Sequence, residues 1–384
     1  MIRSKALYLD NNATTHPLPE VLETVDRVWR EAFANPGSRH AAGRGARQVL
    51  EESRETVARI LDAEPDEVVF TSGGTESINL ALFGLARGTG TIATGPGEHP
   101  ATAESVATLV QRGWSHQQLA VDADGRLIEP CEPPGSSRRP DPADLKLVSM
   151  LLAHNETGVI QDVSPLVDRC NAAGVPTHLD CVQAVGKIPV SFKTLGATAL
   201  SFGAHKFHGP RGVGGLLVRR GVRLVSLHHG GHQETDRRPG TEPVALIAGM
   251  AKALELWERD AADRTRTMLA ARDRLEAALA ERCPPVVVHG SQATRLPNTA
   301  SVAFPGVNGD ELLVALDLEG VACSLGSTCA SGSSEPAPIL LAMGVASEVA
   351  LSTVRLSVSF ETTEGEIDDA VARIARVVRR LRGE

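Results

Sequence analysis

The sequence predicts an α/β protein with two domains. Short apolar runs alternate with stretches of helical periodicity through the middle of the chain, which is typical of a sheet layered between helices. The chain has 384 residues, and at roughly 150 residues per domain this length allows two or three domains. Apolar side chains make up 42% of the residues, which is enough to fill large cores.

The first domain is predicted from strands that run into polar loops. Residues 66–86, DEVVFTSGGTESINLALFGLA, have the pattern of a strand, a glycine-rich turn and a helix. Three further segments each consist of an apolar run followed by polar residues: 146–158, 175–187 and 197–210. Residues 211–220, RGVGGLLVRR, predict one more strand after a tight glycine turn. Ligands in such sheets bind beyond the carboxyl ends of the strands, where these loops fall.

The second domain is predicted from the last third of the chain. A charged helical stretch begins at about Ala251 and leads into it. Strand-like segments follow at 285–290, 299–306 and 354–360. Residues 364–384 carry apolar side chains at helical spacing, so we expect an amphipathic helix that covers this second sheet. Between the two halves of the first domain, the Pro-rich run 131–144 is expected to be a surface loop.

Composition and charge exclude several classes of function. The 39 basic and 47 acidic side chains give a net charge of −8, which argues against nucleic acid or an anionic membrane as the main partner. No apolar run approaches the ~18 residues of a membrane helix, and the first residues lack the apolar stretch of a secretory signal. The six cysteines form neither a C-x-x-C pair nor a zinc-type group with histidine. We therefore expect a cytoplasmic protein without a membrane segment, a disulfide framework or a metal site.

The glycine-rich turn at Thr71–Ser77 is a candidate phosphate site. Gly73, Gly74 and Thr75 stand at the predicted start of a helix, where free backbone N–H groups and the helix dipole favour an anion. No Gly-Lys-Ser/Thr follows, so a nucleoside triphosphate is a poor candidate. An ordinary helix cap made by threonine and serine side chains is the alternative interpretation.

Two further strand ends carry a carboxylate and a lysine. Asp180 follows an apolar run together with Gln183, and its carboxylate could cap a helix, coordinate a metal or pair with a ring nitrogen. Lys206 lies directly after a strand, between two histidines, with the small Gly203 and Ala204 beside it. A lysine confined in a pocket has a lowered pKa and can form a Schiff base, whereas an isolated loop lysine is usually a solvated charge.

The segment 323–336, CSLGSTCASGSSEP, is a candidate for an accessible thiol. It surrounds Cys329 with serine, glycine and alanine, which cannot pack a core. A surface loop with an incidental thiol is the alternative. Because an exposed free cysteine is a liability, its presence favours a functional thiol.

Together these features point to a pyridoxal-phosphate site. That cofactor requires a lysine for a Schiff base, an acid at its pyridine nitrogen and a cup for its phosphate. Lys206, Asp180 and the helix start at Gly74–Thr75 match these requirements. His99, in GPGEHPAT, is the candidate flat group over the cofactor ring.

The sequence resembles the cysteine desulfurases of the iron–sulfur assembly type, within the class V aminotransferase group of pyridoxal-phosphate enzymes. Collinear motifs between Tyr8 and Thr363 carry the resemblance: NNATT, NPGSRH, TSGGTES, GEHPA, HNETGVIQD, HLDCVQAVGK, AHKFHGPRG, RPGT, GSTCAS and VRLS. The resemblance implies pyridoxal-phosphate fold type I, with a mostly parallel seven-stranded sheet in a large domain and a smaller α+β domain. We expect residues 15–260 to form the large cofactor-binding domain, and residues 1–14 with 261–384 to form the small domain that carries the active-cysteine loop.

The resemblance also implies which side chains contact the cofactor ring. Lys206 matches the lysine that forms the Schiff base, and Asp180 matches the acid that pairs with the pyridine nitrogen. Asn155 and Gln183 match the residues that hydrogen-bond the phenolic oxygen of the ring. His99 matches the histidine that stacks on it.

Other matches concern the phosphate and the substrate. The residues that match the phosphate cup are Gly74, Thr75 and His205. Gly203 also lies in the cup, where the family usually has a serine whose hydroxyl touches the phosphate. Thr241, in RPGT, matches a residue that reaches the phosphate of the neighbouring subunit, which implies a homodimer. Asn35 and Arg355 match the groups that hold the substrate carboxylate, a role suited to the two-pronged guanidinium of arginine.

The resemblance implies a cysteine desulfurase that converts L-cysteine to L-alanine. Lys206 takes the Cα proton, and Cys329 attacks the substrate sulfur and carries it as a persulfide. His99 is the candidate base that activates the Cys329 thiol. A sulfur-acceptor protein such as an iron–sulfur scaffold is the expected partner. The loop reads SLGSTC where SSGSAC is common, so Leu325 and Thr328 are expected to change its packing.

Other functions remain open on the same scaffold. A selenocysteine lyase or a small-amino-acid aminotransferase would use the same cofactor site, and an aminotransferase would not need Cys329. A non-catalytic relative is the alternative from a different class, supported only by Gly203 and the altered SLGSTC loop. Retention of the Lys206, Asp180 and Cys329 motifs argues against that alternative.

Overall fold

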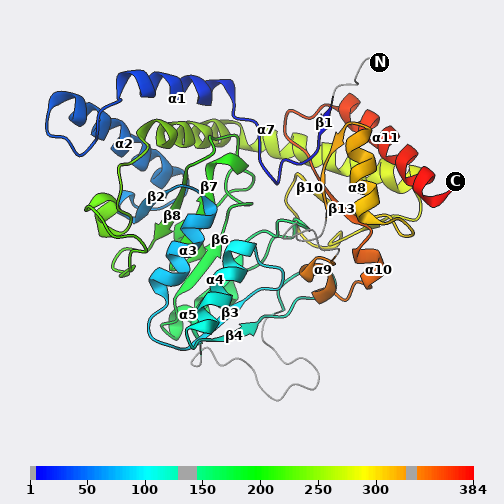
Figure 1. Cartoon of the computed structure of the whole chain (residues 1–384), viewed down its shortest axis with the longest axis horizontal. Coiled ribbons are helices and arrows are strands. Elements are labelled where there is room, and N and C mark those ends of the chain that lie inside the picture. The colour runs from blue at the N-terminus through cyan, green and yellow to red at the C-terminus, as the bar shows by residue number, and fades with distance from the viewer. Residues whose placement is uncertain (1–5, 129–144, 326–334) are drawn as a thin grey trace.

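The computed structural model describes residues 6–128, 145–325 and 335–384. Figure 1 shows a large sheet with its helices on one side of the molecule and two shorter sheets on the other. The Pro-rich run 131–144 and the active-cysteine loop lie outside the described residues, apart from Cys323–Leu325 and Glu335–Pro336 at the ends of that loop segment.

The large sheet confirms the prediction of seven mostly parallel strands. Its strand order is β2-β8-β7-β6-β5-β3-β4, and β8 alone runs antiparallel to its neighbours. The strands are β2 (Val68–Thr71), β3 (Thr91–Thr94), β4 (Ser115–Gln118), β5 (Leu145–Leu151), β6 (Thr177–Asp180), β7 (Ala199–Gly203) and β8 (Gly214–Val218). The predicted tight turn before β8 is present, because Gly212 has a positive φ of 87°.

Helices cover both faces of the large sheet, because successive strand residues point to opposite faces. Leu217 of β8 packs in one core cluster with residues of α1, α2, α5 and α7, whereas Leu216 and Val218 pack in another with α3 and α4. The helices are α1 (Pro19–Glu31), α2 (Ala41–Ile60), α3 (Gly74–Leu85), α4 (Pro100–Gln111), α5 (Ser164–Ala172) and the short α6 (Phe192–Leu195). The described residues also form the 3-10 turns η1 (Pro65–Glu67), η3 (Ala204–Lys206) and η4 (Gln233–Asp236).

The remaining strands form two smaller sheets. An antiparallel sheet has the order β12-β13-β10-β9, and β1 pairs in parallel with β11. The strands are β1 (Leu7–Tyr8), β9 (Val287–Val288), β10 (Thr299–Ala303), β11 (Val321–Ala322), β12 (Ser324–Leu325) and β13 (Thr353–Ser357). The helices of this region are α8 (Gly309–Leu318), α9 (Pro338–Ala342), α10 (Ser347–Ala350) and the predicted C-terminal helix α11 (Glu364–Arg382). Residues of α8 and α11 share one core cluster with β10 and β13, as expected for an amphipathic cover.

A single long helix, α7 (Val244–Arg282), runs from the large sheet to the smaller ones (Figure 1). It begins seven residues before the expected start at Ala251 (251 − 244 = 7). The first two turns, VALIAGM, carry no charged side chain and are almost wholly buried, so they lack the polar face from which an amphipathic helix is predicted.

The buried core divides along α7. Its residues up to Leu256 pack in the cluster of the large sheet, whereas Met268 and later residues pack with the smaller sheets and with Leu7 and Leu9 of the N-terminal segment. We propose that these clusters are the cores of the two expected domains, 15–260 and 1–14 with 261–384.

Candidate active site

A pocket lies at the carboxyl ends of β6 and β7, as expected for ligand sites in sheets of this type. Its volume is about 240 Å³. It collects most of the predicted cofactor residues, because the strand ends and the starts of α3 and α4 meet there. The lining residues are Gly74, Thr75, Ile78, His99, Leu151, Asn155, Asp180, Val182, Gln183, His205 and Lys206.

Glycines allow the start of α3 to approach the pocket closely. A Cβ atom on Gly74 would lie 2.7 Å from Cγ2 of Val182, so no larger residue fits there without a shift. Gly203 ends β7 directly beside it, and a Cβ atom on Gly203 would lie 3.4 Å from the backbone nitrogen of Gly74. The unpaired N–H groups of the α3 N-terminus and the dipole of the helix favour an anion at this end of the pocket.

Asp180 ends β6 and is the buried carboxylate of the pocket. Its side chain is 1% exposed, and its Oδ1 accepts a hydrogen bond of 2.9 Å from the backbone N–H of Val182. Burial raises the pKa of this carboxyl group to about 6, while that hydrogen bond and Lys206 oppose the rise. A carboxylate at this position is suited to hold a protonated ring nitrogen.

Lys206 ends the short turn η3 that follows β7. Its Nζ donates hydrogen bonds to the backbone oxygens of Asn12 and Ala13, at 2.5 and 2.9 Å. Burial, followed by the positive charge of Arg355, lowers the pKa of this amine to about 8. Since an unperturbed lysine has a pKa near 10.4, a larger fraction of the Lys206 amine is neutral and nucleophilic at physiological pH.

Both histidines of the pocket are neutral near pH 7. Burial, followed by the charge of Lys206, lowers the pKa of His99 and of His205 to about 4. His99 caps α4, where its Nδ1 accepts the N–H of Ala101. The neutral His99 ring therefore carries its proton on Nε2. His205 Nδ1 lies 3.2 Å from the hydroxyl of Thr14.

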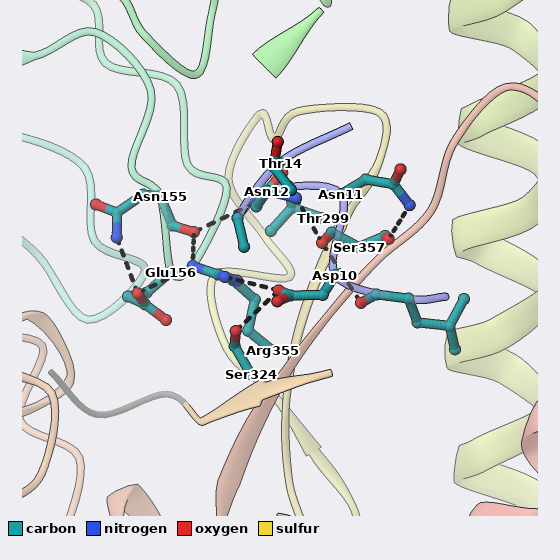
Figure 2. Close-up of polar contacts among 12 residues, drawn as sticks. Asp10, Asn11, Asn12, Thr14, Asn155, Glu156, Thr299, Ser324, Arg355 and Ser357 are labelled. Atoms are coloured by element: carbon teal, nitrogen blue, oxygen red, sulfur yellow. Dashed lines mark hydrogen bonds and ion pairs between the residues drawn. The ribbon is translucent and has the colours of Figure 1, made fainter. Parts of the chain in front are cut away.

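Gln183 and Asn155 are fixed by the N-terminal segment. Nε2 of Gln183 donates to the backbone oxygen of Asn12 at 2.9 Å. The backbone oxygen of Asn155 accepts from Nδ2 of Asn12 at 3.2 Å (Figure 2). Asn155 donates from its own Nδ2 to Glu156, whereas its buried Oδ1 has no hydrogen-bond partner among the described residues. Both amides therefore lie in the pocket with hydrogen-bonding capacity left for a ligand.

Arg355 lies beside the pocket and does not line it. Its guanidinium donates to Asp10 Oδ1 at 2.9 Å and to Glu156 Oε1 at 3.1 Å, and Ser324 donates to the same oxygen of Asp10 (Figure 2). In this state two carboxylates of the chain hold the arginine that was expected to bind the substrate carboxylate.

Asn35 and Thr241 lie away from Lys206 within the chain. Both are exposed and line a different pocket of about 310 Å³ beside α1 and the start of α7. Thr241 also lines a wider cavity of about 740 Å³, which Thr75 at the start of α3 lines as well. The single chain therefore does not bring Asn35 or Thr241 to Lys206, although Thr241 shares a cavity with Thr75.

The active-cysteine loop is described only at its edges. Cys329 and Thr328 lie outside the described residues, so the accessibility of the Cys329 thiol stays a prediction. Leu325 ends β12, where its partly buried side chain packs against the core of the smaller sheets. The other thiol of this segment, Cys323, is a poor nucleophile, because burial raises its pKa to about 12.

Two buried polar residues, Asn12 and Lys187, and the partly buried Glu98 lie near the site and escaped sequence analysis. Asn12 forms hydrogen bonds with Gln183, Lys206 and Asn155. Lys187 donates a hydrogen bond to Gln183. The pKa of the Glu98 carboxyl group is raised by burial and by the charge of Asp180. Each stands inside a quoted motif, NNATT, HLDCVQAVGK or GEHPA, so the signal was present. Among the described residues, no cluster of His, Cys, Asp and Glu could hold a metal ion.

Comparison with known proteins places the chain in a family. The family model for class-V aminotransferases matches residues 7–369. The chain is 38% identical to cysteine desulfurase IscS of Dictyoglomus turgidum, over 98% of this chain and 96% of that protein. It is 39% identical to cysteine desulfurase NifS of Azotobacter vinelandii, over 98% of this chain and 93% of that protein.

A solved structure agrees with these relatives. A NifS-like protein superposes with a TM-score of 0.88 at 34% identity, over 98% of this chain and the whole of that one. Sequence and fold thus agree along almost the full length. The chain belongs to the class-V aminotransferase family and, within it, to the cysteine desulfurases.

Proposed function

We propose that this protein is a pyridoxal-phosphate-dependent cysteine desulfurase that converts L-cysteine to L-alanine and transfers the sulfur to Cys329 as a persulfide. The observation that carries the proposal is the single pocket in which Lys206, Asp180 and the start of α3 meet. The similar proteins named cysteine desulfurase support the same reaction.

The residues of the pocket fit the cofactor. Gly203 and Gly74 leave a cradle at the positive end of α3 that suits a phosphate. Asp180 would hold the ring nitrogen. Oδ1 of Asn155, which has no partner among the described residues, supports a role of this amide in binding a ring substituent. When bound, pyridoxal phosphate would supply an electron sink that weakens the Cα–H and Cβ–S bonds of the amino acid.

Lys206 is the proposed base for the Cα proton. With a pKa of about 8, its Nζ can both accept and release a proton near neutral pH. His99 is assigned to ring stacking and hydrogen bonding. Because its Nδ1 already accepts the N–H of Ala101, its neutral ring offers an N–H donor at Nε2 and no second acceptor.

Sulfur transfer is proposed to occur at Cys329. Its thiolate forms a bond to the sulfur of the substrate while the Cβ–S bond breaks and leaves its electron pair on carbon. That carbon then takes a proton and becomes the methyl group of alanine. Cys329 keeps the transferred sulfur as a persulfide until an acceptor takes it.

A homodimer is the proposed assembly, and the position of Thr241 supports it. Thr241 shares an open cavity with Thr75 on the outer side of α3, where a second subunit could reach the cofactor of the first. Asn35 lies in the neighbouring pocket with Thr241 and is proposed to act across the same interface. The sulfur acceptor is proposed to be a second protein, such as an iron–sulfur scaffold.

The cytoplasm is the proposed location. The described thiols Cys170, Cys181, Cys283 and Cys323 are all free, as is usual in a reducing compartment. No helix in the described part of the chain is long and apolar enough to cross a membrane.

Replacing Cys329 tests the function. The wild-type protein, loaded with pyridoxal phosphate, is expected to form alanine and sulfide from L-cysteine in the presence of a thiol. Cys329→Ala is expected to keep the cofactor absorbance and to lose nearly all alanine formation, whereas Cys323→Ala is the control that keeps it. Undiminished turnover by Cys329→Ala would contradict the persulfide step and favour an aminotransferase. Faster turnover of L-selenocysteine than of L-cysteine would indicate a selenocysteine lyase.

A further inference from the structure

A second lysine lies buried beside the pocket. Lys187 is 3% exposed, and burial, followed by the charges of Lys206 and Arg355, lowers the pKa of its amine. Its Nζ donates to Oδ1 of Asn12 at 2.8 Å and to Oε1 of Gln183 at 2.5 Å. Lys187 does not line the pocket itself, so it cannot reach a ligand there directly.

The backbone holds Lys187 tightly in this position. Gly186, the preceding residue, has a positive φ of 75°, which residues with a side chain rarely adopt. A Cβ atom on Gly186 would also collide with Phe207, the residue that follows Lys206. The turn that carries Lys187 is therefore packed directly against the segment that carries Lys206.

The contact with Lys187 fixes the direction of the Gln183 amide. The carbonyl Oε1 accepts from the amine of Lys187, and Nε2 donates to the backbone oxygen of Asn12. A flipped amide would place Nε2 against the donor Lys187 and Oε1 against the acceptor Asn12. Since an amide nitrogen carries two hydrogens, the second N–H of Nε2 stays available to the pocket.

Asn12 links this contact to the rest of the site. Its backbone oxygen accepts from both Lys206 and Gln183, and its Nδ2 donates to Oγ1 of Thr299 on β10 at 2.9 Å (Figure 2). Its Oδ1 accepts from Asn298 as well as from Lys187. The buried polar atoms of Asn12 thus have hydrogen-bond partners both beside the large sheet and at β10, and these partners hold the residue in one position.

We propose that Lys187 is a positioning residue, which acts through Gln183 and Asn12 to make the pocket present an N–H donor to the ring of the cofactor. The proposal rests on the proposed pyridoxal-phosphate site. Without the amine, only the backbone oxygen of Asn12 holds the Gln183 amide in this direction, so its carbonyl oxygen turns more readily toward the electron-rich oxygen of the ring.

Lys187→Met, which keeps the volume and removes the donor, tests this role. We expect about tenfold weaker binding of pyridoxal phosphate, because the Gln183 amide loses a hydrogen bond that fixes its direction. We also expect a shifted absorbance maximum of the bound cofactor at a fixed pH. Lys193→Met, at an exposed lysine of α6, is the matched control and should leave both unchanged. Circular dichroism and the melting temperature of the cofactor-free protein report folding separately.

A double-variant cycle shows whether Lys187 acts through Gln183. In the Gln183→Leu background, Lys187→Met should weaken cofactor binding by less than about twofold, since the partner is already gone. The proposal would be overturned if Lys187→Met weakened cofactor binding equally in the wild-type and Gln183→Leu backgrounds. It would also be overturned if Lys187→Met bound the cofactor with the affinity and absorbance maximum of the wild type. A wild-type protein that binds no pyridoxal phosphate would instead contradict the proposed function. Should Lys187→Met not fold, Lys187→Gln, whose side chain is too short to reach both partners, is compared by the same criteria.

Discussion

Burial sets the protonation states of single residues around the pocket. It lowers the pKa of Lys206 to about 8 and of His99 to about 4, and it raises that of Asp180 to about 6. At neutral pH the pocket therefore holds an amine that exchanges its proton readily, a neutral imidazole and an ionised carboxylate. That set matches the requirements of acid–base chemistry at the α carbon of an amino acid.

The lowered pKa of Lys206 predicts how stability depends on pH in the cofactor-free protein. Below pH 8 the amine is protonated in the folded and unfolded states alike. Between pH 8 and about 10.4 only the unfolded state keeps the proton, so the free energy of unfolding rises with pH, by up to about 3 kcal/mol. Chemical denaturation at pH 7.5 and pH 10 measures this change.

Lys206→Met is the variant that isolates the effect, because other titrating groups are common to both proteins. The difference in unfolding free energy between wild type and Lys206→Met should shift in favour of the wild type as the pH rises. A difference that stays constant between pH 7.5 and pH 10 would show that the pKa of Lys206 is ordinary.

The glycine at position 203 leaves room for a serine, whose hydroxyl is expected to strengthen the binding of the cofactor phosphate. A Cβ atom at this position would lie 3.4 Å from the nitrogen of Gly74, which the neighbouring backbone tolerates with little or no movement. Gly203→Ser is therefore expected to bind pyridoxal phosphate about tenfold more tightly, through one hydrogen bond to an anion. Fluorescence titration measures the affinity, and Gly203→Ala is the control. Equal affinities of the serine and alanine variants would show that the hydroxyl does not reach the phosphate.

At the scale of elements, a strained turn precedes the residue expected to reach the partner subunit. Glu234, Thr235 and Asp236 in η4 all have positive φ, and such a conformation is rare for a β-branched residue. Arg54 of α2 holds Glu234 in place through two hydrogen bonds, and the N–H of Phe70 donates to the same carboxylate. This buried ion pair stabilises the turn that leads to Thr241 in its strained conformation.

Thr235→Gly is predicted to stabilise the protein by about 1 kcal/mol, because glycine adopts a positive φ without a steric penalty. Thermal unfolding measures the change. Thr108→Gly, within the helix α4, is the same substitution in a helical backbone and should destabilise by up to about 0.5 kcal/mol. A loss of stability by Thr235→Gly as large as that of Thr108→Gly would contradict the strain at Thr235.

Most elements that position the site follow from local sequence. The strands ending at Asp180 and Gly203 and the helix starting at Gly74 were predicted because each alternates sharply between apolar and polar residues. The start of α7 was missed because a fully buried helix end carries no polar face. The roles of Asn12 and Lys187 were missed for another reason. Their hydrogen-bond partners lie up to 287 residues away in the sequence, and such a long-range contact leaves no local pattern.

At the scale of the whole molecule, the N-terminal segment joins the two groups of sheets. Asn12 contacts Gln183 beside the large sheet and Thr299 in a smaller one, so this residue links the lining of the pocket to the second sheet. The family resemblance predicted the sheet and the pocket. It implied that Thr241 acts on the neighbouring subunit, but it did not indicate that Asn35 also lies away from Lys206 within one chain.

The proposed homodimer predicts which apolar surface is covered. Trp29 and Phe33 of the α1 region are 60% and 76% exposed beside the pocket that contains Asn35 and Thr241. Replacing both with glutamate should convert the dimer to a monomer, as measured by light scattering after gel filtration. Leu318→Glu, at an 81% exposed residue of α8, is the control and should leave the mass unchanged. A wild-type monomer, or dissociation by the control alone, would contradict this interface.

The most direct test of the account is to locate the lysine that binds the cofactor. Reduction of the protein with borohydride in the presence of pyridoxal phosphate fixes the cofactor covalently, and peptide mass spectrometry then identifies the modified residue. The account predicts modification of Lys206, the one lysine among the residues that line the pocket. Modification of Lys187 or of a surface lysine in place of Lys206, or no modification at all, would contradict it.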